Sequence, residues 1–413
     1  MSATHKSILM LGCFDTKGEV FSFLRQCLLA QGEAVLAVNT GVMGTTENYP
    51  VDIEADLLAK EAGFSISGLR EAADRGHAVQ VMGKGAALVV ARLVAEGRIK
   101  GAIGMGGGGG TYIALSAMQS IPLGIPKLCL STIAAKDLSR QVGNKDITLM
   151  PSVVDVAGLN SISRLLIAQA AAAICAMANV QPTEDAVRAG SIAISMFGNT
   201  TSCVKHCTAL LEKQGYEVLA FHATGVGGRT MEALIREGCF DAVLDITTTE
   251  LADELCGGIC SAGPDRLSAA AEMGIPQVVV PGCLDMVNFA QPDTVPEQYK
   301  SRQLYSWAPD VTLMRTNEAE NRLLGEELAR KVSRSTAAAV LLPLRGISQV
   351  DAVGGVFHRP DIDQVLFDAI KEHTDEQVPV MEVDAHINDK AFAGTAVKVL
   401  LDLVAKSKAR QQQ

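Results

Sequence analysis

The chain has 413 residues, of which 48% are hydrophobic and 4% aromatic, and its formal net charge is −10. This length suits two or three domains with cores of their own, and the negative charge without any Lys/Arg cluster argues against a nucleic-acid partner. Because the sequence shows no signal-peptide pattern and no uncharged apolar run near the ~18 residues of a membrane span, we predict a cytoplasmic protein with no membrane partner.

Short apolar runs alternate with helical patterns along the chain. After the first run, Phe21, Leu24 and Leu28 recur at helical spacing. The runs themselves are apolar throughout, which is typical of strands covered on both faces of a parallel sheet. The strand candidates of the first half are 8–11 (ILML), 35–38 (VLAV), 102–105 (AIGM) and 127–130 (KLCL).

The sequence repeats itself once. Residues 7–44 and 191–228 share an apolar strand, a polar turn, an amphipathic helix, a second strand and a Thr-Gly-Val loop. Such internal similarity indicates a duplicated fold. Two further pairs of segments correspond in the same order: 97–107 with 238–248, and 124–132 with 274–282.

A polar segment with a proline, 176–191, separates the two copies. We therefore predict an α/β fold of two duplicated, doubly wound Rossmann-like halves with mainly parallel sheets and a ligand cleft between them. Residues 1–182 form the N-terminal, nucleotide-binding domain. Residues 183–413 form the C-terminal domain, with added strands and helices at its end.

Five consecutive glycines, 106–110, join the strand candidate at 102–105 to a helix pattern that starts near Thr111. Glycine permits positive φ values and a close approach of the backbone to an anion, and Thr111 suits the N-cap of a helix whose first amides bind phosphate. The motif is neither a P-loop nor a first-strand G-x-G-x-x-G. A flexible linker is the alternative, but the strand-loop-helix context favours phosphate contacts by Gly107, Gly108, Gly109, Gly110 and Thr111.

The polar turn after the first strand supplies further candidates, since ligands of open parallel sheets bind at the carboxyl ends of the strands. Asp15 suits a ribose hydroxyl or Mg²⁺, Thr16 suits a phosphate, and Lys17 would neutralise one. A helix cap with a solvated lysine is the alternative. We predict cofactor contacts by these three residues and by Gly41 in the loop after the second strand.

The second half differs at the strand end that matches the glycine run. Its sequence there, DITTTE (245–250), offers hydroxyls and carboxylates for sugar hydroxyls, a cation or a polar substrate, and a helix N-cap cluster is the alternative. We predict substrate contacts from both halves. The residues are Ser131, Thr132, Thr247, Thr248, Thr249 and Glu250.

Two other groups of residues are suited to chemistry. His386 is a candidate general acid/base because imidazole titrates near neutrality, with Asp389 to orient it; a structural histidine followed by a helix cap is the alternative. Ten cysteines sit singly in apolar runs, as buried reduced thiols do. No metal site is predicted, although the four-residue spacing of Cys203/Cys207 and Cys256/Cys260 leaves metal binding open.

Taken together these motifs resemble the family of ATP-binding modules named for the tomato mosaic virus resistance protein. The resemblance covers nearly the full length and rests on GCFDTKGEV, NTGVMG, GMGGGGGT, STIAAKD, DITLMPSVVDVAGLN, DITTTEL, LPLRGIS and DAHIND. It implies two Rossmann-like subdomains, ATP binding in the N-terminal module, and a homodimer. On the matching positions the nucleotide contacts would fall on Asp15, Thr16, Lys17, the Gly41 loop and 107–111. The plant protein's role in viral inhibition is not expected here.

We therefore predict an ATP-binding protein, with Mg²⁺ as an optional companion, that serves a small polar metabolite by phosphoryl transfer or ATP-dependent activation. Phosphoryl transfer depends mainly on positioning and charge stabilisation, which glycine loops and a lysine supply. Two alternatives stay open. One is a non-catalytic, nucleotide-gated module, and the other is an enzyme that acts on a phosphorylated metabolite without a nucleotide.

Overall fold

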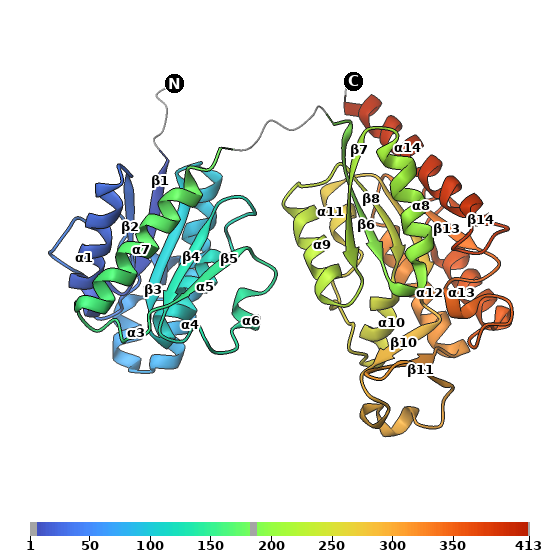
Figure 1. The fold of residues 1–413 in the computed structure, drawn as a ribbon, viewed down its shortest axis with the longest axis horizontal. Coiled ribbons are helices and arrows are strands. Elements are labelled where there is room, and N and C mark those ends of the chain that lie inside the picture. The colour runs from blue at the N-terminus through green and yellow to red at the C-terminus, as the bar shows by residue number, and fades with distance from the viewer. Residues whose placement is uncertain (1–5, 182–187, 412–413) are drawn as a thin grey trace. The chain divides into compact units, whose positions relative to one another are not determined.

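The computed structural model of the chain describes residues 6–181 and 188–411. It divides into two compact units, Met1–Thr183 and Glu184–Gln413, each of which contains a parallel sheet with helices on both faces (Figure 1). The predicted boundary between residues 182 and 183 lies outside the described residues.

The N-terminal unit is built on a five-stranded sheet with the strand order β2-β1-β3-β4-β5. All four pairs of neighbouring strands are parallel. Its elements are β1 (Ser7–Gly12), α1 (Phe14–Ala30), β2 (Val35–Asn39), α2 (Ala55–Glu61), α3 (Ile66–Ala72), α4 (Arg75–Ala95), β3 (Ile99–Gly106), α5 (Gly108–Met118), β4 (Lys127–Ser131), α6 (Ser139–Val142), β5 (Ile147–Pro151) and α7 (Ser161–Ala178).

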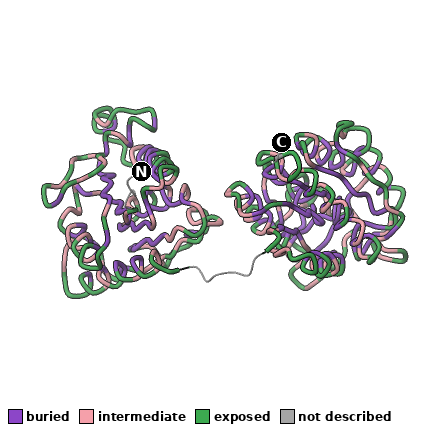
Figure 2. The backbone as a smooth tube through the Cα atoms, turned by 90° about the horizontal axis from the view of Figure 1, so that it is seen from above, coloured by how far each residue is buried: buried purple, intermediate pink, exposed green. Residues whose placement is uncertain are grey.

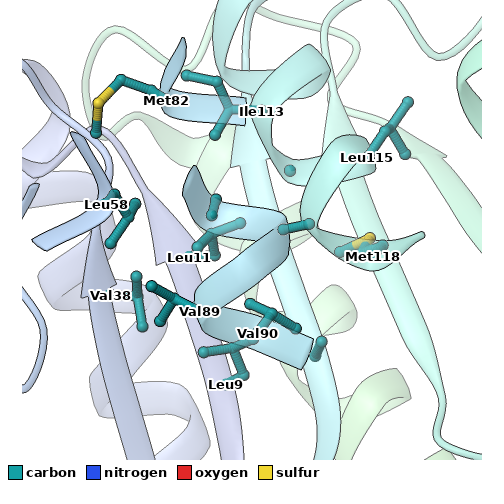
Figure 3. Packing of buried hydrophobic residues seen from close by; sticks show 14 of the residues in the cluster. Leu9, Leu11, Val38, Leu58, Met82, Val89, Val90, Ile113, Leu115 and Met118 are labelled. Carbon is teal, nitrogen blue, oxygen red and sulfur yellow. The ribbon is translucent and has the colours of Figure 1, made fainter. Parts of the chain in front are cut away.

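Both faces of this sheet are buried, which explains why its strands lack polar alternation. Leu9 and Leu11 of β1 belong to the cluster that includes residues of α4 and α5 (Figure 3), whereas Ile8 and Met10 belong to the cluster with α1 and α7 on the other face. Successive side chains of a strand point to opposite faces, so both sets must be apolar. Buried residues accordingly follow the strands through each unit (Figure 2).

The C-terminal unit has a six-stranded parallel sheet with the order β14-β13-β9-β8-β6-β7, and an antiparallel sheet β10-β12-β11 is inserted between β9 and β13. Its elements are β6 (Gly190–Met196), α8 (Thr201–Glu212), β7 (Tyr216–His222), α9 (Val226–Arg236), β8 (Ala242–Thr247), α10 (Thr249–Cys256), α11 (Ala269–Met273), β9 (Gln277–Gly282), β10 (Met286–Phe289), β11 (Leu304–Ala308), β12 (Val311–Arg315), α12 (Glu318–Val332), β13 (Ala338–Pro343), α13 (Pro360–His373), β14 (Val380–Val383) and α14 (Lys390–Gln411).

The two parallel sheets have the same order of strands. The first reads β2-β1-β3-β4-β5, and the second reads β7-β6-β8-β9-β13, followed by β14 at its edge. The predicted α/β fold of two duplicated, doubly wound halves is thus confirmed. The strands and helices after β13 are the predicted additions to the second half.

Two helices, α4 and α7, are long and apolar enough to cross a membrane by length and composition alone. Both pack within the N-terminal unit: α4 lies against α5 and α2, and α7 lies against α1 and β3. Their apolar residues form part of the two clusters that cover the sheet.

Candidate functional site

The strand order of the N-terminal unit has a switch point between β1 and β3, where connections leave toward opposite faces and a crevice opens at the carboxyl ends. A pocket of about 510 Å³ lies there. The structure brings five of the predicted cofactor contacts to its wall from the ends of three different strands. These are Asp15, Thr16, Gly41, Gly109 and Gly110.

The glycine run is not the predicted loop, because Gly106 ends β3 and residues 108–110 already form the first turn of α5. The helix begins at Gly108 with Gly107 as N-cap, and none of residues 106–110 has a positive φ. Glycine is needed for close packing instead, because a Cβ on Gly106 would lie 2.9 Å from Gly110 Cα. The amides that open this helix are therefore carried by residues without side chains, and Gly108 faces open space.

Thr111 is not the N-cap that the sequence predicts. It is fully buried in α5, where its Oγ1 lies 2.6 Å from Ser131 Oγ and donates to Gly106 O at 3.3 Å. Ser131 is also buried, and it accepts a hydrogen bond from Ile133 N. Thr111 and Ser131 therefore join α5 to β4, whereas the exposed Thr132 lies beside Gly107. The pocket lining includes none of Gly107, Thr111, Ser131 and Thr132.

Asp15 holds the loop that follows β2. The residues predicted as a polar turn lie in the first turn of α1, and Asp15 Oδ2 accepts a hydrogen bond from Met43 N at 2.9 Å. Asp15 Oδ1 is buried without a partner and would lie 2.3 Å from a Cβ on Gly41. Gly41 therefore has to be glycine. Asp15 lines the pocket and keeps one oxygen without a partner, so its contact with a ribose or Mg²⁺ stays a prediction.

Lys17 does not lie at the pocket. Its Nζ donates to Val156 O at 3.0 Å, away from the pocket wall. The cations at the pocket are Arg70 and Arg75, which sequence reasoning missed. Arg70 Nε donates to Val42 O at 2.6 Å, whereas the exposed Arg75 has neither a hydrogen bond nor an ion pair within the described ranges.

The remaining wall of the pocket is mainly apolar. Leu69, Val79, Met82 and Ile113 contribute it from α3, α4 and α5. Cys13 also lines the pocket, but burial raises the pKa of its thiol, so a thiolate nucleophile is not expected there. The pocket thus combines helix-start amides and guanidinium groups on one side with an apolar surface on the other.

The corresponding place in the C-terminal unit is filled by its own side chains. Arg266 is fully buried, and its guanidinium binds both oxygens of Asp245 at 2.6 Å and Glu250 Oε2 at 2.6 Å. Glu250 Oε1 in turn accepts hydrogen bonds from Gly225 N at 2.7 Å and Gly228 N at 3.1 Å. This network closes the switch point between β6 and β8.

The threonines predicted to bind substrate are buried in the same region. Thr247 Oγ1 lies 2.7 Å from Thr200 Oγ1, Thr248 Oγ1 donates to Val280 O, and Thr249 Oγ1 accepts from Asn288 Nδ2. With Glu250 these side chains all have partners in the protein. Substrate contact by them stays a prediction, and the geometry favours a supporting role. A pocket of about 520 Å³ between α10 and α12 contains none of the predicted site residues.

His386 and Asp389 are arranged as structural groups rather than as the predicted catalytic pair. Nδ1 of His386 accepts a hydrogen bond from Asn388 N at 3.1 Å, so Nε2 is the nitrogen that donates to Ser348 O at 2.9 Å. Asp389 Oδ2 accepts from the backbone N of His386, not from its ring. Both ring nitrogens are occupied, which leaves none for acid/base work in this conformation.

The cysteines offer no metal centre among the residues that the structure describes. None of the ten is in a disulfide, and Cys203 and Cys207 face each other with their Sγ atoms 4.0 Å apart inside α8. No group of three or more His, Cys, Asp or Glu side chains in residues 6–181 and 188–411 could hold a metal ion.

Comparisons with known proteins identify relatives over the whole chain. Models of the uncharacterised protein family UPF0261 match residues 6–183 (N-terminal domain) and 190–404 (C-terminal domain). The UPF0261 protein of Clostridium tetani is 44% identical over 404 residues, covering 97% of this chain and 100% of that protein. The ToMV resistance protein Tm-1(GCR237) of Solanum lycopersicum is 38% identical over 342 residues, covering 81% of this chain but 45% of the tomato protein.

Solved structures give a weaker comparison. The glycosyltransferase SnogD from Streptomyces nogalater aligns over 96% of this chain and 99% of its own, with 11% identity and a TM-score of 0.21. That overlap is too low to carry an argument. The relatives in sequence, by contrast, confirm the resemblance that the motifs indicate.

Proposed function

This chain belongs to the UPF0261 family, and from that premise we propose that its N-terminal unit binds ATP in the pocket at the switch point between β1 and β3. The observation that carries the proposal is the composition of this pocket. Gly109 and Gly110 from the start of α5 line this space of about 510 Å³ together with Arg70 and Arg75. Ligand pockets of proteins commonly measure about 300–1,000 Å³.

The phosphates would sit at the start of α5. The first amides of a helix are unpaired donors and lie at the positive end of its dipole, which favours an anion. Arg75 supplies a guanidinium free for charge-assisted bonds to phosphate oxygens. The apolar side chains of Val79, Met82 and Ile113 suit the uncharged part of a nucleotide. The resemblance to ATP-binding modules favours ATP among ligands of this kind.

Mg²⁺ would enter with the phosphates. Asp15 already accepts a hydrogen bond from Met43 N, and its other oxygen is packed against Gly41. A phosphate-bound Mg²⁺ that keeps several water ligands needs no dedicated protein cage. We therefore propose Mg²⁺ only as a companion of ATP.

The bound ATP serves a small polar metabolite by phosphoryl transfer or activation in this proposal, because amides and arginines supply the positioning and charge stabilisation that such transfer needs. A nucleotide-gated module without chemistry is the first alternative. The second is an enzyme that binds a phosphorylated metabolite and no nucleotide. Both alternatives would use the same anion site at α5.

Calorimetry on the full chain tests the proposal, with ATP, ADP, NAD and a sugar phosphate, each with and without Mg²⁺. Arg75→Ala should weaken ATP binding about tenfold to a hundredfold, since a hydrogen bond to a charged group contributes ~1.5–3 kcal/mol. Arg92→Ala is the matched control, because Arg92 lies on the same helix at its far end and pairs with Glu61.

Equal ATP affinity of wild type and Arg75→Ala would refute the assigned site. Absence of ATP binding at millimolar concentration would refute both nucleotide hypotheses and leave the sugar phosphate as the ligand to pursue. If ATP binds, product analysis with a panel of polar metabolites distinguishes an enzyme from a gated module.

A further inference from the structure

Three aspartates gather around one arginine inside the C-terminal unit. Asp285 follows β9, Asp351 ends the short 3-10 helix η4 (Gln349–Asp351), Asp363 lies in the first turn of α13, and Arg315 ends β12. None of the four is more than 4% exposed. Burying a charge is costly unless it is paired, so three carboxylates against a single guanidinium is an unfavourable state.

The contacts within the cluster show how the excess of negative charge is accommodated. Arg315 Nη2 lies 2.6 Å from Asp363 Oδ1 and 3.9 Å from Asp351 Oδ1. Both carboxylates thus lie against the same nitrogen of Arg315, and one guanidinium balances the negative charge of only one of them. A proton on the other carboxylate removes the unbalanced buried charge. Asp285 accepts from Ser348 Oγ at 2.7 Å, while its Oδ1 is buried without a partner.

The surroundings favour a held proton. Burial and then the charge of Asp285 raise the pKa of Asp351 to about 9, and burial raises the pKa of Asp285 to about 6. The other titratable or charged residues facing the cluster are His358, whose Nδ1 lies 2.9 Å from Asp351 O, Cys283, and Arg359, whose backbone N donates to Asp351 Oδ1 at 3.4 Å and whose guanidinium pairs with Asp361. The part of the chain that the structure describes offers no three-ligand metal group to take the place of the proton.

The cluster also fastens a segment of chain that follows β13. Asp351 Oδ2 accepts from Ile347 N at 2.9 Å, and Asp285 holds the neighbouring Ser348. At the other end of the segment, Arg315 Nε donates to Phe357 O at 2.9 Å. Residues 345–359, which include Asp351 itself, are thus tied to Asp285 through Ser348 and to Arg315 through Phe357.

We propose that this cluster is a proton-binding site that latches residues 345–359 onto the carboxyl ends of β9 and β13. The proton is bound by Asp351, because Asp363 is the carboxylate that pairs closely with Arg315. When it leaves at alkaline pH, a further negative charge is buried beside Asp285, and the segment loosens. The inference does not depend on nucleotide binding by the other unit.

The variant Asp351→Asn tests the proton directly. The amide keeps the shape and an acceptor for Ile347 N, but it does not titrate. The pKa of Asp351 is raised on folding, so the folded chain holds one more proton than the unfolded chain between about pH 4 and 9, and stability is lost as pH rises through that window. From this group alone the unfolding constant should rise about tenfold per pH unit.

Urea unfolding of the full chain at pH 6, 7 and 8, followed by Trp307, measures this slope, because Trp307 is the single tryptophan and lies in the C-terminal unit. In wild type the unfolding constant should rise with pH about tenfold more per pH unit than it does in Asp351→Asn. Asp368→Asn is the matched control. It lies on α13, the helix that carries Asp363, and is exposed, and the pKa of Asp368 is lowered by hydrogen bonds from Gln364 and Lys371.

Equal slopes for wild type and Asp351→Asn would overturn the proton site, as would an equal loss of slope in Asp368→Asn. The latch is tested by hydrogen exchange at pH 9.5, where amides of 345–359 should exchange faster in wild type than in Asp351→Asn. The same exchange in both would overturn the latch. If Asp351→Asn does not fold, Asp363→Asn removes the neighbouring carboxylate instead. Its pH slope of the unfolding constant is then compared with those of wild type and Asp368→Asn.

Discussion

The two halves of this protein treat the same topological position in opposite ways. In each half a carboxylate holds the Thr-Gly-Val loop after the second strand: Asp15 bonds Met43 N in the first, and Glu250 bonds Gly225 N and Gly228 N in the second. The difference is where the carboxylate comes from. Asp15 stands on the helix after the first strand, whereas Glu250 stands on the helix after the third.

The position of this carboxylate determines whether a pocket is present at the switch point. Gly108 and Thr249 are the first residues of the helices that follow β3 and β8, so Gly109 corresponds to Glu250. In the second half the side chain of Glu250 and its partner Arg266 occupy the switch point. In the first half the glycine leaves the space open. Among the residues that the structure describes, the switch point of the first half opens into a pocket and that of the second half is filled by its own side chains.

The largest effect that would test this comparison is expected for Arg266→Met. The substitution removes the guanidinium and leaves the buried carboxyl groups of Asp245, Glu250 and Glu232 without their cation. Breaking a buried charge network in this way costs about 3–5 kcal/mol of the free energy of unfolding. Urea unfolding followed by Trp307 fluorescence measures it.

Ligand binding by the first half serves as the control for that variant. ATP affinity should be unchanged in Arg266→Met, because Arg266 belongs to the other compact unit. A loss of unfolding free energy below about 1 kcal/mol would show that the ion pairs of Arg266 are not a buried network that occupies the switch point.

A smaller effect is expected from making the first half resemble the second. Gly109→Glu places a carboxylate in the pocket, where it occupies space and repels phosphate, so ATP affinity should fall about a hundredfold or more, or ~2.7 kcal/mol. The helix should tolerate the change: the new Cβ would lie 3.3 Å from Val79 Cγ2, and an acidic residue suits a first turn. Calorimetry measures the affinity.

Gly108→Glu is the matched control for Gly109→Glu. A Cβ on Gly108 meets nothing within 4 Å and Gly108 does not line the pocket, so the same charge added there should weaken binding only about threefold. Similar losses in both variants would mean that the effect is one of charge at the start of α5, not of filling the pocket.

The sequence predicted the fold well because its signals are local. Apolar runs without alternation and a repeat of strand, helix and strand predict two parallel sheets, and the duplication predicts that both have the same strand order; the order itself is given by the structure. The strand-end rule also located Asp15, Thr16, Gly41, Gly109 and Gly110, which the structure places around one pocket. Such positions are predictable because the rule depends on topology alone.

The sequence was less informative where a role depends on contacts across the fold. Thr111 was predicted as an N-cap from its residue type, but packing of Gly106 against Gly110 lets the helix start earlier. Arg70 and Arg75 were missed because they come from residues 40–98, a connection between β2 and β3 that is far longer than its counterpart 223–241. That difference in length was the available signal.

The smallest effect on ATP affinity is expected for Lys17→Met. This variant tests whether the phosphates contact Lys17, as the sequence predicts, or Arg75, as the structure indicates. Lys17 donates to Val156 O and does not line the pocket, so ATP affinity should stay within about twofold of wild type and the lost hydrogen bond should cost ~1 kcal/mol of unfolding free energy at most. Calorimetry measures the ATP affinities of Lys17→Met and Arg75→Ala side by side. The two variants are comparable because each removes one positive charge from the same unit. A tenfold loss in Lys17→Met would restore Lys17 as a phosphate contact and would place the phosphates between α1 and the loop of Val156, away from Arg75.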